Sequence, residues 1–237
     1  MNMTVYFHLA KPQGEGLYAD RMKGSPKPEQ EIRWCPLTKN KTDGTRHLDG
    51  SRRISDLALQ VTHNDRRETM IWSWMSECLI HESLLEEFRR AKLTGVRTRP
   101  AEVRFKDGVV SRDYNEMVVT GWAGLARPES GIRVEKSCPA CHWKTYSPLK
   151  NAEEVIDWSQ WSGDDFFIVW PMPSYILITE RVAELLLRLD VQSLELRGLE
   201  DSRRSIVVDG AGFCVARLSN FMPEDLAIKY GRPLGLE

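Results

Sequence analysis

The chain lacks long apolar runs and an excess of either charge. No segment reaches the roughly 18 consecutive apolar residues that a membrane-spanning helix needs, and residues 1–9 have neither the basic start nor the long apolar stretch of a secretory signal peptide. The 33 Lys and Arg residues are balanced by 34 Asp and Glu residues, for a net charge of -1. General nucleic-acid-binding proteins usually carry a basic surplus. We therefore expect a cytoplasmic protein with no membrane contact and no nucleic-acid partner.

Motifs of the common enzyme classes are also missing. The sequence contains no GxGxxG or GxxxxGK[ST] phosphate-binding pattern and no GxSxG nucleophile pattern. Its five histidines form neither HxxH nor HxxxH, so no pair of them has the spacing that places two zinc ligands on one helix face. No residue is nominated as catalytic, and we predict that the protein is not an enzyme.

What the sequence does contain is an internal repeat. Residues 72–99 and 170–197 align without a gap at an offset of 98, with eight identities in 28 positions. A strand-like apolar run opens the central part of each copy, at residues 78–80 and 175–178. A helix is expected to follow His81 or Thr179, with apolar residues at helical spacing, and a second strand over residues 96–99 or 194–197. We infer a duplicated strand–helix–strand unit.

This pattern predicts an α+β fold with two similar halves packed into one compact body. The N-terminal half, residues 1–130, holds the first repeat unit, and the C-terminal half, residues 131–237, holds a CxxC motif and the second unit. A hairpin is expected from strand-like residues 103–105 and 117–119 around the turn 106–108. A similar pair is expected at 205–208 and 213–215. Residues 14–50, rich in Gly, Pro, Lys and Asp, are predicted to be a long loop.

The cysteines point to a metal site. They number five, an odd count that argues against a disulfide framework. Cys138 and Cys141 form a CxxC, whose tight turn can aim two thiolates at one zinc ion. Cys35 begins a second such element, but Thr38 stands where its partner cysteine would be, so a fourth ligand would come from His142, His47 or water. The alternative is a tight turn without metal. We expect no bound cofactor, with zinc as the alternative.

Residues 153–170 combine carboxylates with aromatic rings. Such a segment makes a suitable docking surface for a basic protein, because charges speed encounter and rings supply buried anchors. The alternative is a loop whose tryptophans cover the core while its carboxylates face solvent. The residues that we predict to bind a partner are Asp157, Trp158, Trp161, Asp164 and Asp165.

The layout resembles the double-CXXCG motif family of bacterial proteins, which are regarded as immunity proteins of contact-dependent toxin systems. The resemblance rests on Cys35-Pro36, on Cys138-Pro139-Ala140-Cys141, on the aromatic, Asp-rich residues 163–167 and on the run 176–181 before a Leu-rich helix. It covers most of residues 32–200. The chain departs from the family at Thr38 and at His142, which stands in place of glycine. The resemblance nominates only Cys35, Cys138 and Cys141 as metal ligands.

The resemblance implies a cytoplasmic immunity protein that binds a cognate toxin or effector domain and neutralises it by occlusion, without catalysis. The competing hypothesis is a zinc-ribbon-like metal-binding module that serves nucleic-acid or regulatory interactions. Metal content and partner chemistry separate the two.

Overall fold

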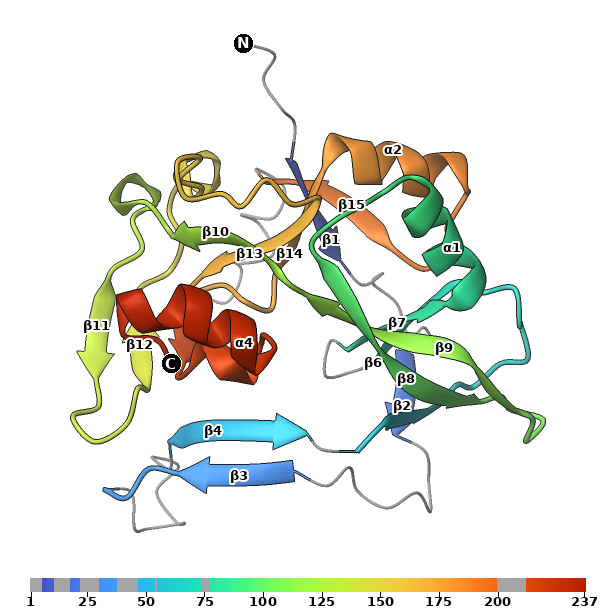
Figure 1. Ribbon diagram of the computed structural model, residues 1–237, viewed down its shortest axis with the longest axis horizontal. Coiled ribbons are helices and arrows are strands. Elements are labelled where there is room, and N and C mark those ends of the chain that lie inside the picture. Colours follow the sequence, from blue (N-terminus) through green and yellow to red (C-terminus); the bar gives the residue numbers. More distant parts are fainter. Residues whose placement is uncertain are drawn as a thin grey trace.

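The computed structural model describes residues 6–10, 18–21, 30–37, 47–53, 55–73, 77–199 and 212–237. It confirms a mixed helix and sheet protein, 22% helical and 38% strand, folded into one compact body with several sheets (Figure 1). Within these ranges, no helix combines the length and the apolar character that crossing a membrane requires. Residues 205–208, expected to form a strand, lie outside the described residues.

Long runs of strands are interrupted by few helices in the described chain. The strands are β1 (Tyr6–Ala10), β2 (Tyr18–Arg21), β3 (Gln30–Trp34), β4 (Leu48–Arg53), β5 (Leu57–Gln60), β6 (Met70–Ser73), β7 (Cys78–His81), β8 (Val96–Arg104), β9 (Val110–Val119), β10 (Gly121–Leu125), β11 (Val134–Ser137), β12 (Lys144–Tyr146), β13 (Phe166–Trp170), β14 (Ile176–Thr179), β15 (Glu195–Gly198) and β16 (Phe213–Val215). The helices are α1 (Glu82–Arg90), α2 (Glu180–Arg188) and α4 (Glu224–Leu226), followed by a π-helical turn, η4 (Ala227–Gly231). Short 3₁₀ turns are η1 (Pro128–Ser130), η2 (Ala152–Glu154), η3 (Leu218–Asn220) and η5 (Arg232–Leu234).

The two repeat units lie in two different sheets. The first lies in a closed barrel with the strand order β2-β5-β8-β9-β7-β6, and the second lies in a five-stranded sheet with the order β10-β13-β14-β1-β15. In the barrel, β6 pairs parallel with β2 and antiparallel with β7, and β9 lies antiparallel between β7 and β8. In the sheet, β13 pairs parallel with β10 and antiparallel with β14, and β1 lies antiparallel between β14 and β15. The order and direction of pairing are therefore the same.

The two sheets exchange strands. Strand β9, which lies between β7 and β8 in the barrel, runs on into β10, the edge of the five-stranded sheet (Figure 1). Strand β1, which lies between β14 and β15 in that sheet, precedes β2, the barrel strand whose place corresponds to that of β10. The strand β1 therefore belongs to the sheet that otherwise comes from residues 121–198.

The two helices begin and end alike. Each follows its strand directly and spans nine residues, at the offset of 98 that the sequence repeat has. His81 is the N-cap of α1, where its Nδ1 accepts the Ser83 N–H at 3.2 Å. Lys92 and Asp190, just past the two helices, both have a φ of 52°. This left-handed conformation ends the helical turn and directs the chain towards the next strand.

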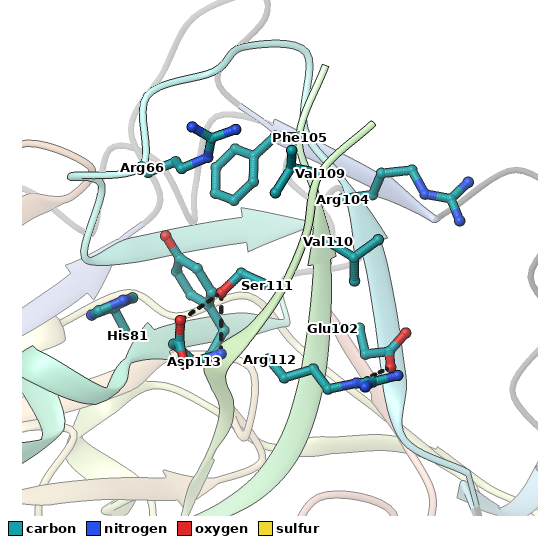
Figure 2. A pocket seen from close by; sticks show the side chains of 11 residues that line it. Arg66, His81, Glu102, Arg104, Phe105, Val109, Val110, Ser111, Arg112 and Asp113 are labelled. Atoms are coloured by element: carbon teal, nitrogen blue, oxygen red, sulfur yellow. Dashed lines mark hydrogen bonds and ion pairs between the residues drawn. The ribbon is translucent and has the colours of Figure 1, made fainter. Parts of the chain in front are cut away.

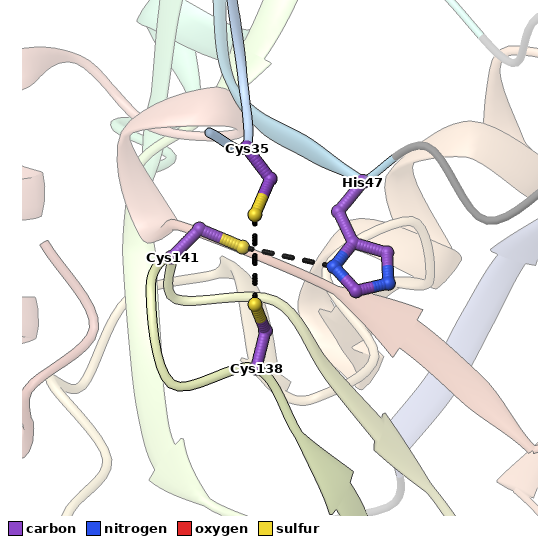
Figure 3. A group of neighbouring side chains, drawn as sticks. All are labelled: Cys35, His47, Cys138 and Cys141. Atoms are coloured by element: carbon purple, nitrogen blue, oxygen red, sulfur yellow. Dashed lines mark hydrogen bonds between the residues drawn. The ribbon is translucent and has the colours of Figure 1, made fainter. Parts of the chain in front are cut away.

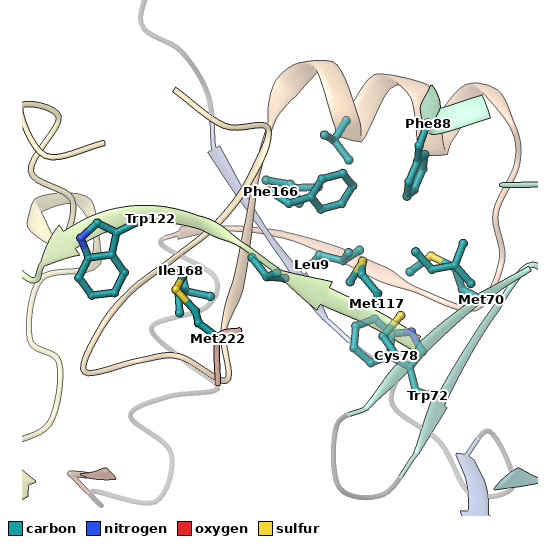
Figure 4. Packing of buried hydrophobic residues seen from close by; sticks show 14 of the residues in the cluster. Leu9, Met70, Trp72, Cys78, Phe88, Met117, Trp122, Phe166, Ile168 and Met222 are labelled. Carbon is teal, nitrogen blue, oxygen red and sulfur yellow. The ribbon is translucent and has the colours of Figure 1, made fainter. Parts of the chain in front are cut away.

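Alternating side chains divide the interior between a shared core and two separate ones. On β6 and β7, Met70 and Ile80 face the shared core together with both helices, whereas Ile71 and Leu79 fill the barrel. On β13 all five residues are buried, because alternate side chains enter the shared core and a third cluster behind the sheet. Figure 4 shows the shared core, with Phe166 from the sheet next to Phe88 from α1. A register slip of one residue would exchange these faces.

Two glycines let the backbone come close to Phe166 of β13. A Cβ atom on Gly95, just before β8 of the barrel, would collide with the Phe166 carbonyl oxygen, and so would one on Gly121 of β10, in the same five-stranded sheet as Phe166. The Gly95 contact therefore joins the barrel to the five-stranded sheet. The Gly95 oxygen accepts the Thr120 N–H at 2.8 Å, and the Phe166 N–H donates to the Thr94 oxygen at 3.1 Å. Gly95 also has a φ of +85°, a conformation that side chains disfavour. Only glycine allows this approach.

Several local predictions are confirmed and one is wrong. The hairpin of residues 103–119 forms as β8 and β9, and Trp72 and Trp170 are buried in the core. Residues 14–50 are not one long loop, because they contain β2, β3 and the start of β4. The error arose because β3 is a short strand with exposed side chains at Ile32 and Trp34 and gives little apolar periodicity.

Replacing Gly95 by alanine tests the contact between the sheets. Gly108 is the matched control, since its φ is +87° and nothing lies within 4 Å of its Cβ position. Gly108→Ala should cost about 1–2 kcal/mol for the left-handed backbone alone. Gly95→Ala should cost about 1–3 kcal/mol more, because Phe166 must also move. Denaturant unfolding measures both, and equal losses would mean that the contact is not tight.

Candidate metal centre

Two hairpins place four metal-ligating side chains together. Cys35 follows β3 and His47 precedes β4, while Cys138 follows β11 and Cys141 lies in the turn before β12. One ligand atom of each of these residues lies within 4.8 Å of the other three (Figure 3). Each hairpin therefore supplies two ligands, and the pairs come from sequence positions about a hundred residues apart.

Hydrogen bonds between the backbones of each hairpin set these positions. The Cys35 N–H donates to the His47 oxygen at 3.1 Å, directly after the β3–β4 ladder ends with Trp34 opposite Leu48. The Cys138 N–H donates to the Trp143 oxygen at 3.0 Å and closes the turn that contains both cysteines. Residues opposite one another at the end of a hairpin have neighbouring side chains. Both ligand pairs follow from this local geometry.

The distances between the ligands fit a tetrahedral ion. Zinc–sulfur bonds of about 2.3 Å at tetrahedral angles place two sulfur atoms about 3.8 Å apart. The Sγ atoms of Cys35 and Cys138 lie 3.5 Å apart, and the Cys141 Sγ lies 3.9 Å from the His47 Nδ1. Three thiolates and one imidazole are also a common donor set of structural zinc sites. The residues present therefore fit a zinc ion.

Neighbouring groups orient and bury the ligands. The His47 ring stacks on Trp143 of the other hairpin, with centroids 3.9 Å apart and an interplanar angle of 6°. Cys35 and Cys141 are buried, whereas Cys138 and His47 are partly exposed. A fixed imidazole and shielded thiols limit the reorganisation that metal binding would require.

The thiol groups differ in acidity. Backbone amides, above all that of Ala140, donate to the Cys138 sulfur and lower its pKa to about 6. Burial raises the pKa of Cys141 to about 12. At neutral pH the Cys138 sulfur is therefore ready to bind a cation, whereas Cys141 must first lose its proton.

The structure brings together the three cysteines nominated by the sequence and selects the fourth residue. Of the three options, His47 is the side chain that completes the set. His142 follows Cys141 directly, but its Nδ1 lies 3.2 Å from the Gly235 oxygen. The four residues can hold a metal ion, so the zinc alternative has a geometric basis. The expectation of no bound cofactor stays untested.

The acidic and aromatic segment lies against the edge of the five-stranded sheet. The Ser162 N–H donates to the Trp122 oxygen at 2.8 Å, and the Ser162 hydroxyl accepts the Trp122 N–H at 3.0 Å. Trp158 is 46% exposed, while Trp161 is half-buried and donates its indole N–H to the Asp164 oxygen. The segment thus satisfies part of the open edge of β10.

The carboxylates at the two ends of this segment differ in exposure and in hydrogen bonding. Hydrogen bonds from the Ser159 hydroxyl and then from Gln160 lower the pKa of Asp157, which keeps its charge near the surface. Asp165 is buried instead, and its carboxylate accepts bonds from the Thr94 N–H, the Thr179 hydroxyl and Arg181. Asp165, predicted to bind a partner, therefore joins the two repeat units. The Thr179 side chain makes no N-cap bond to α2, since it faces Asp165.

An open groove of about 700 Å³ runs along the outside of the barrel (Figure 2). Two of its arginines are neutralised internally, since Arg66 pairs with Asp107 at 2.5 Å and Arg112 pairs with Glu102 at 2.7 Å. His81 in its wall is the N-cap of α1. Among the described residues, the four metal ligands form the group with the clearest chemistry.

Comparison with known proteins adds no relative. No model of a known protein family matches the chain, and no curated protein matches it either.

The selection of His47 over His142 can be tested by zinc content. On the zinc alternative, the purified chain should hold one zinc ion, lose most of it in His47→Ala, and retain it in His142→Ala. Removing a ligand takes away a zinc–nitrogen bond, whereas His142 contacts only a carbonyl. Elemental analysis of protein purified without chelator measures this, and loss in His142→Ala with retention in His47→Ala would overturn the assignment.

The acidity of the thiols predicts a pH dependence of metal affinity. The pKa of Cys141 is about 12, so this thiol is protonated between pH 6 and 8 and must release a proton on binding. The apparent zinc affinity should therefore rise about tenfold or more per pH unit over this range, and acid should release the metal. Competition with a zinc-binding dye at several pH values measures the slope, and a pH-independent affinity would contradict the ligand set.

Proposed function

We propose that this chain is a zinc-stabilised binding protein that acts through a stable complex with another polypeptide. The observation that carries the proposal is the convergence of three thiols and one imidazole from two hairpins. A zinc ion with four protein ligands has no open position for a substrate or an activated water. The contribution of such an ion would therefore be structural, which suits a protein that acts by recognition.

The zinc ion would replace packing that the small hairpins cannot provide. The strand β3 pairs only with β4 among the described strands, and this hairpin holds two of the four ligands. A small two-stranded hairpin is marginally stable by itself. Metal binding supplies folding free energy in such elements because the site forms only when they fold. Cys35 and His47 on one side, with Cys138 and Cys141 on the other, would fix the two hairpins to each other.

We further propose that the partner is a toxin or effector domain, which the chain occludes in the bacterial cytoplasm. This rests on the resemblance to the double-CXXCG family of immunity proteins and on the five free cysteines, which suit a reducing compartment. The surface that we assign to the partner surrounds Asp157 and Trp158, with Trp161 and Asp164 behind them. Trp158 is exposed, and interface anchors are often aromatic rings of this size.

The strand pairing supports a gene duplication. We propose that the units around α1 and α2 are copies of one ancestral module. They share pairing order, helix bounds and the left-handed residues Lys92 and Asp190. The hairpin β3–β4 lies between β2 and β5 along the chain, and the hairpin β11–β12 lies between β10 and β13. Each hairpin holds two of the four ligands. The zinc ion would then lie between equivalent positions of the two copies.

The metal ligands also fit the second candidate, a zinc-ribbon-like module for nucleic-acid or regulatory interactions. Such a module should bind duplex or single-stranded nucleic acid with an affinity that falls as salt is raised. Filter binding with the zinc-loaded protein distinguishes the two. Tight, salt-dependent binding would favour the nucleic-acid function over toxin neutralisation.

The partner surface is tested with substitutions that leave the fold intact. Trp158→Ala and Asp157→Lys should each weaken binding to the cognate toxin by about tenfold or more, which is the effect of removing an interface anchor. Leu187→Ala is the control, because Leu187 is a 68% exposed apolar residue on α2. The probe is the C-terminal domain of the protein encoded directly upstream of this gene, with pull-down and survival on co-expression as the measurements.

Two results would contradict different parts of this proposal. Unchanged binding of Trp158→Ala and Asp157→Lys would mean that the interface lies elsewhere. Failure of the wild-type chain to bind or neutralise that domain would contradict the immunity function itself. Asp165→Lys is unsuitable as a test, because it would disrupt the buried bonds to Thr94 and Thr179.

A further inference from the structure

We propose that the metal centre is also a site of reversible oxidation, in which Cys35 and Cys138 form a disulfide that joins the two hairpins and releases the bound metal. The release of zinc rests on the proposed function, because that function supplies the bound ion. The formation of the disulfide rests on the positions of the thiols alone.

Cys35 and Cys138 are the pair placed for bond formation. Their Sγ atoms lie 3.5 Å apart, and a disulfide bond is about 2.0 Å long. The sulfur atoms therefore need to approach by only about 1.5 Å. The Cys141 sulfur lies instead beside the imidazole of His47, at 3.9 Å from its Nδ1.

Exposure assigns different roles to the two thiols. Cys138 is partly exposed at the end of its hairpin, so a small oxidant in solution can reach it. Cys35 is only 3% exposed, and its Sγ lies 3.5 Å from that of Cys138. Cys138 is therefore the residue that the oxidant oxidises first. Cys35 then reacts with the oxidised Cys138 sulfur to form the disulfide.

Hydrogen peroxide supplies the oxidising equivalents. The Cys138 thiolate attacks one peroxide oxygen, so that an S–O bond forms, the O–O bond breaks and the departing hydroxide takes up a proton to become water. The Cys35 thiolate then attacks the Cys138 sulfur, the S–S bond forms, and the S–O bond breaks with loss of a second hydroxide, which is also protonated. Two thiolates, one peroxide and two protons give one disulfide and two water molecules. The zinc ion loses two ligands and dissociates.

The cysteine that bonds to Cys138 decides whether the disulfide links the two hairpins. A Cys35–Cys138 disulfide crosses from β3–β4 to β11–β12, as the metal ion would. A Cys138–Cys141 disulfide would close within one hairpin and leave the two hairpins without a covalent or metal link, in contact through the stacked rings of His47 and Trp143. The described β3–β4 residues would then keep the ion pair between the Asp49 Oδ1 and the Arg217 Nε, at 2.7 Å. Oxidation through Cys35 therefore preserves the connection that the metal provides.

Peptide mapping of the wild-type chain tests the proposal. The zinc-loaded protein is treated with hydrogen peroxide, free thiols are blocked, and released zinc is measured with a chelating dye. Trypsin cleavage separates Cys35, in residues 34–39, from Cys138 and Cys141, in residues 137–144. We expect one cross-linked pair of these peptides for each zinc released, and reversal by dithiothreitol with recovery of zinc binding.

Variants identify the sulfur atoms without relying on one mutant. Cys141→Ser should still form the cross-link, Cys35→Ser should not, and Cys214→Ser, at an exposed position on β16, should behave as wild type. A disulfide within residues 137–144 of the wild-type chain, or zinc release without any cross-link, would overturn the inference. If the purified chain holds no zinc but its peptides cross-link on oxidation, the disulfide stands and the proposed metal function fails.

Discussion

Four side chains from two hairpins have to meet at one point, and this requirement links every level of the structure. Cys35 and His47 come from β3–β4, while Cys138 and Cys141 come from β11–β12. Each hairpin can place its own two ligands through local hydrogen bonds, but neither can complete a tetrahedral site. The remaining fold has to hold the hairpins in register to within a few tenths of an ångström, because metal–ligand distances tolerate little error.

The C-terminal segment provides part of that register, because β16 pairs with β12 and Arg217 pairs with Asp49 of β4. The barrel and the five-stranded sheet form the main body. They share one core between them, exchange strands through β9–β10 and β1–β2, and come into backbone contact at Gly95. Asp165 adds a buried polar connection between the end of α1 and the start of α2. Such a body moves as a unit, since close-packed cores resist deformation. For the proposed binding function, such a body would present a fixed surface, which limits the entropy lost on association.

Sequence reasoning was accurate where short-range patterns decide the outcome. The helices over residues 82–90 and 180–188 follow from apolar spacing, and the two Cys-Pro elements pointed to the three cysteines that the structure brings together. It could not choose between His47 and His142, because the choice depends on a contact between residues 94 positions apart, Cys141 and His47. Asp165 was expected at the surface for the same reason: its partner Thr94 lies 71 positions away. Barrel closure likewise depends on pairings between distant strands.

X-ray absorption at the zinc edge of the native protein tests the central claim most directly. The account predicts one zinc ion per chain with three sulfur neighbours at about 2.3 Å and one nitrogen neighbour at about 2.0 Å. A first shell of oxygen or nitrogen atoms, or a folded chain that contains no zinc and takes none up, would contradict it.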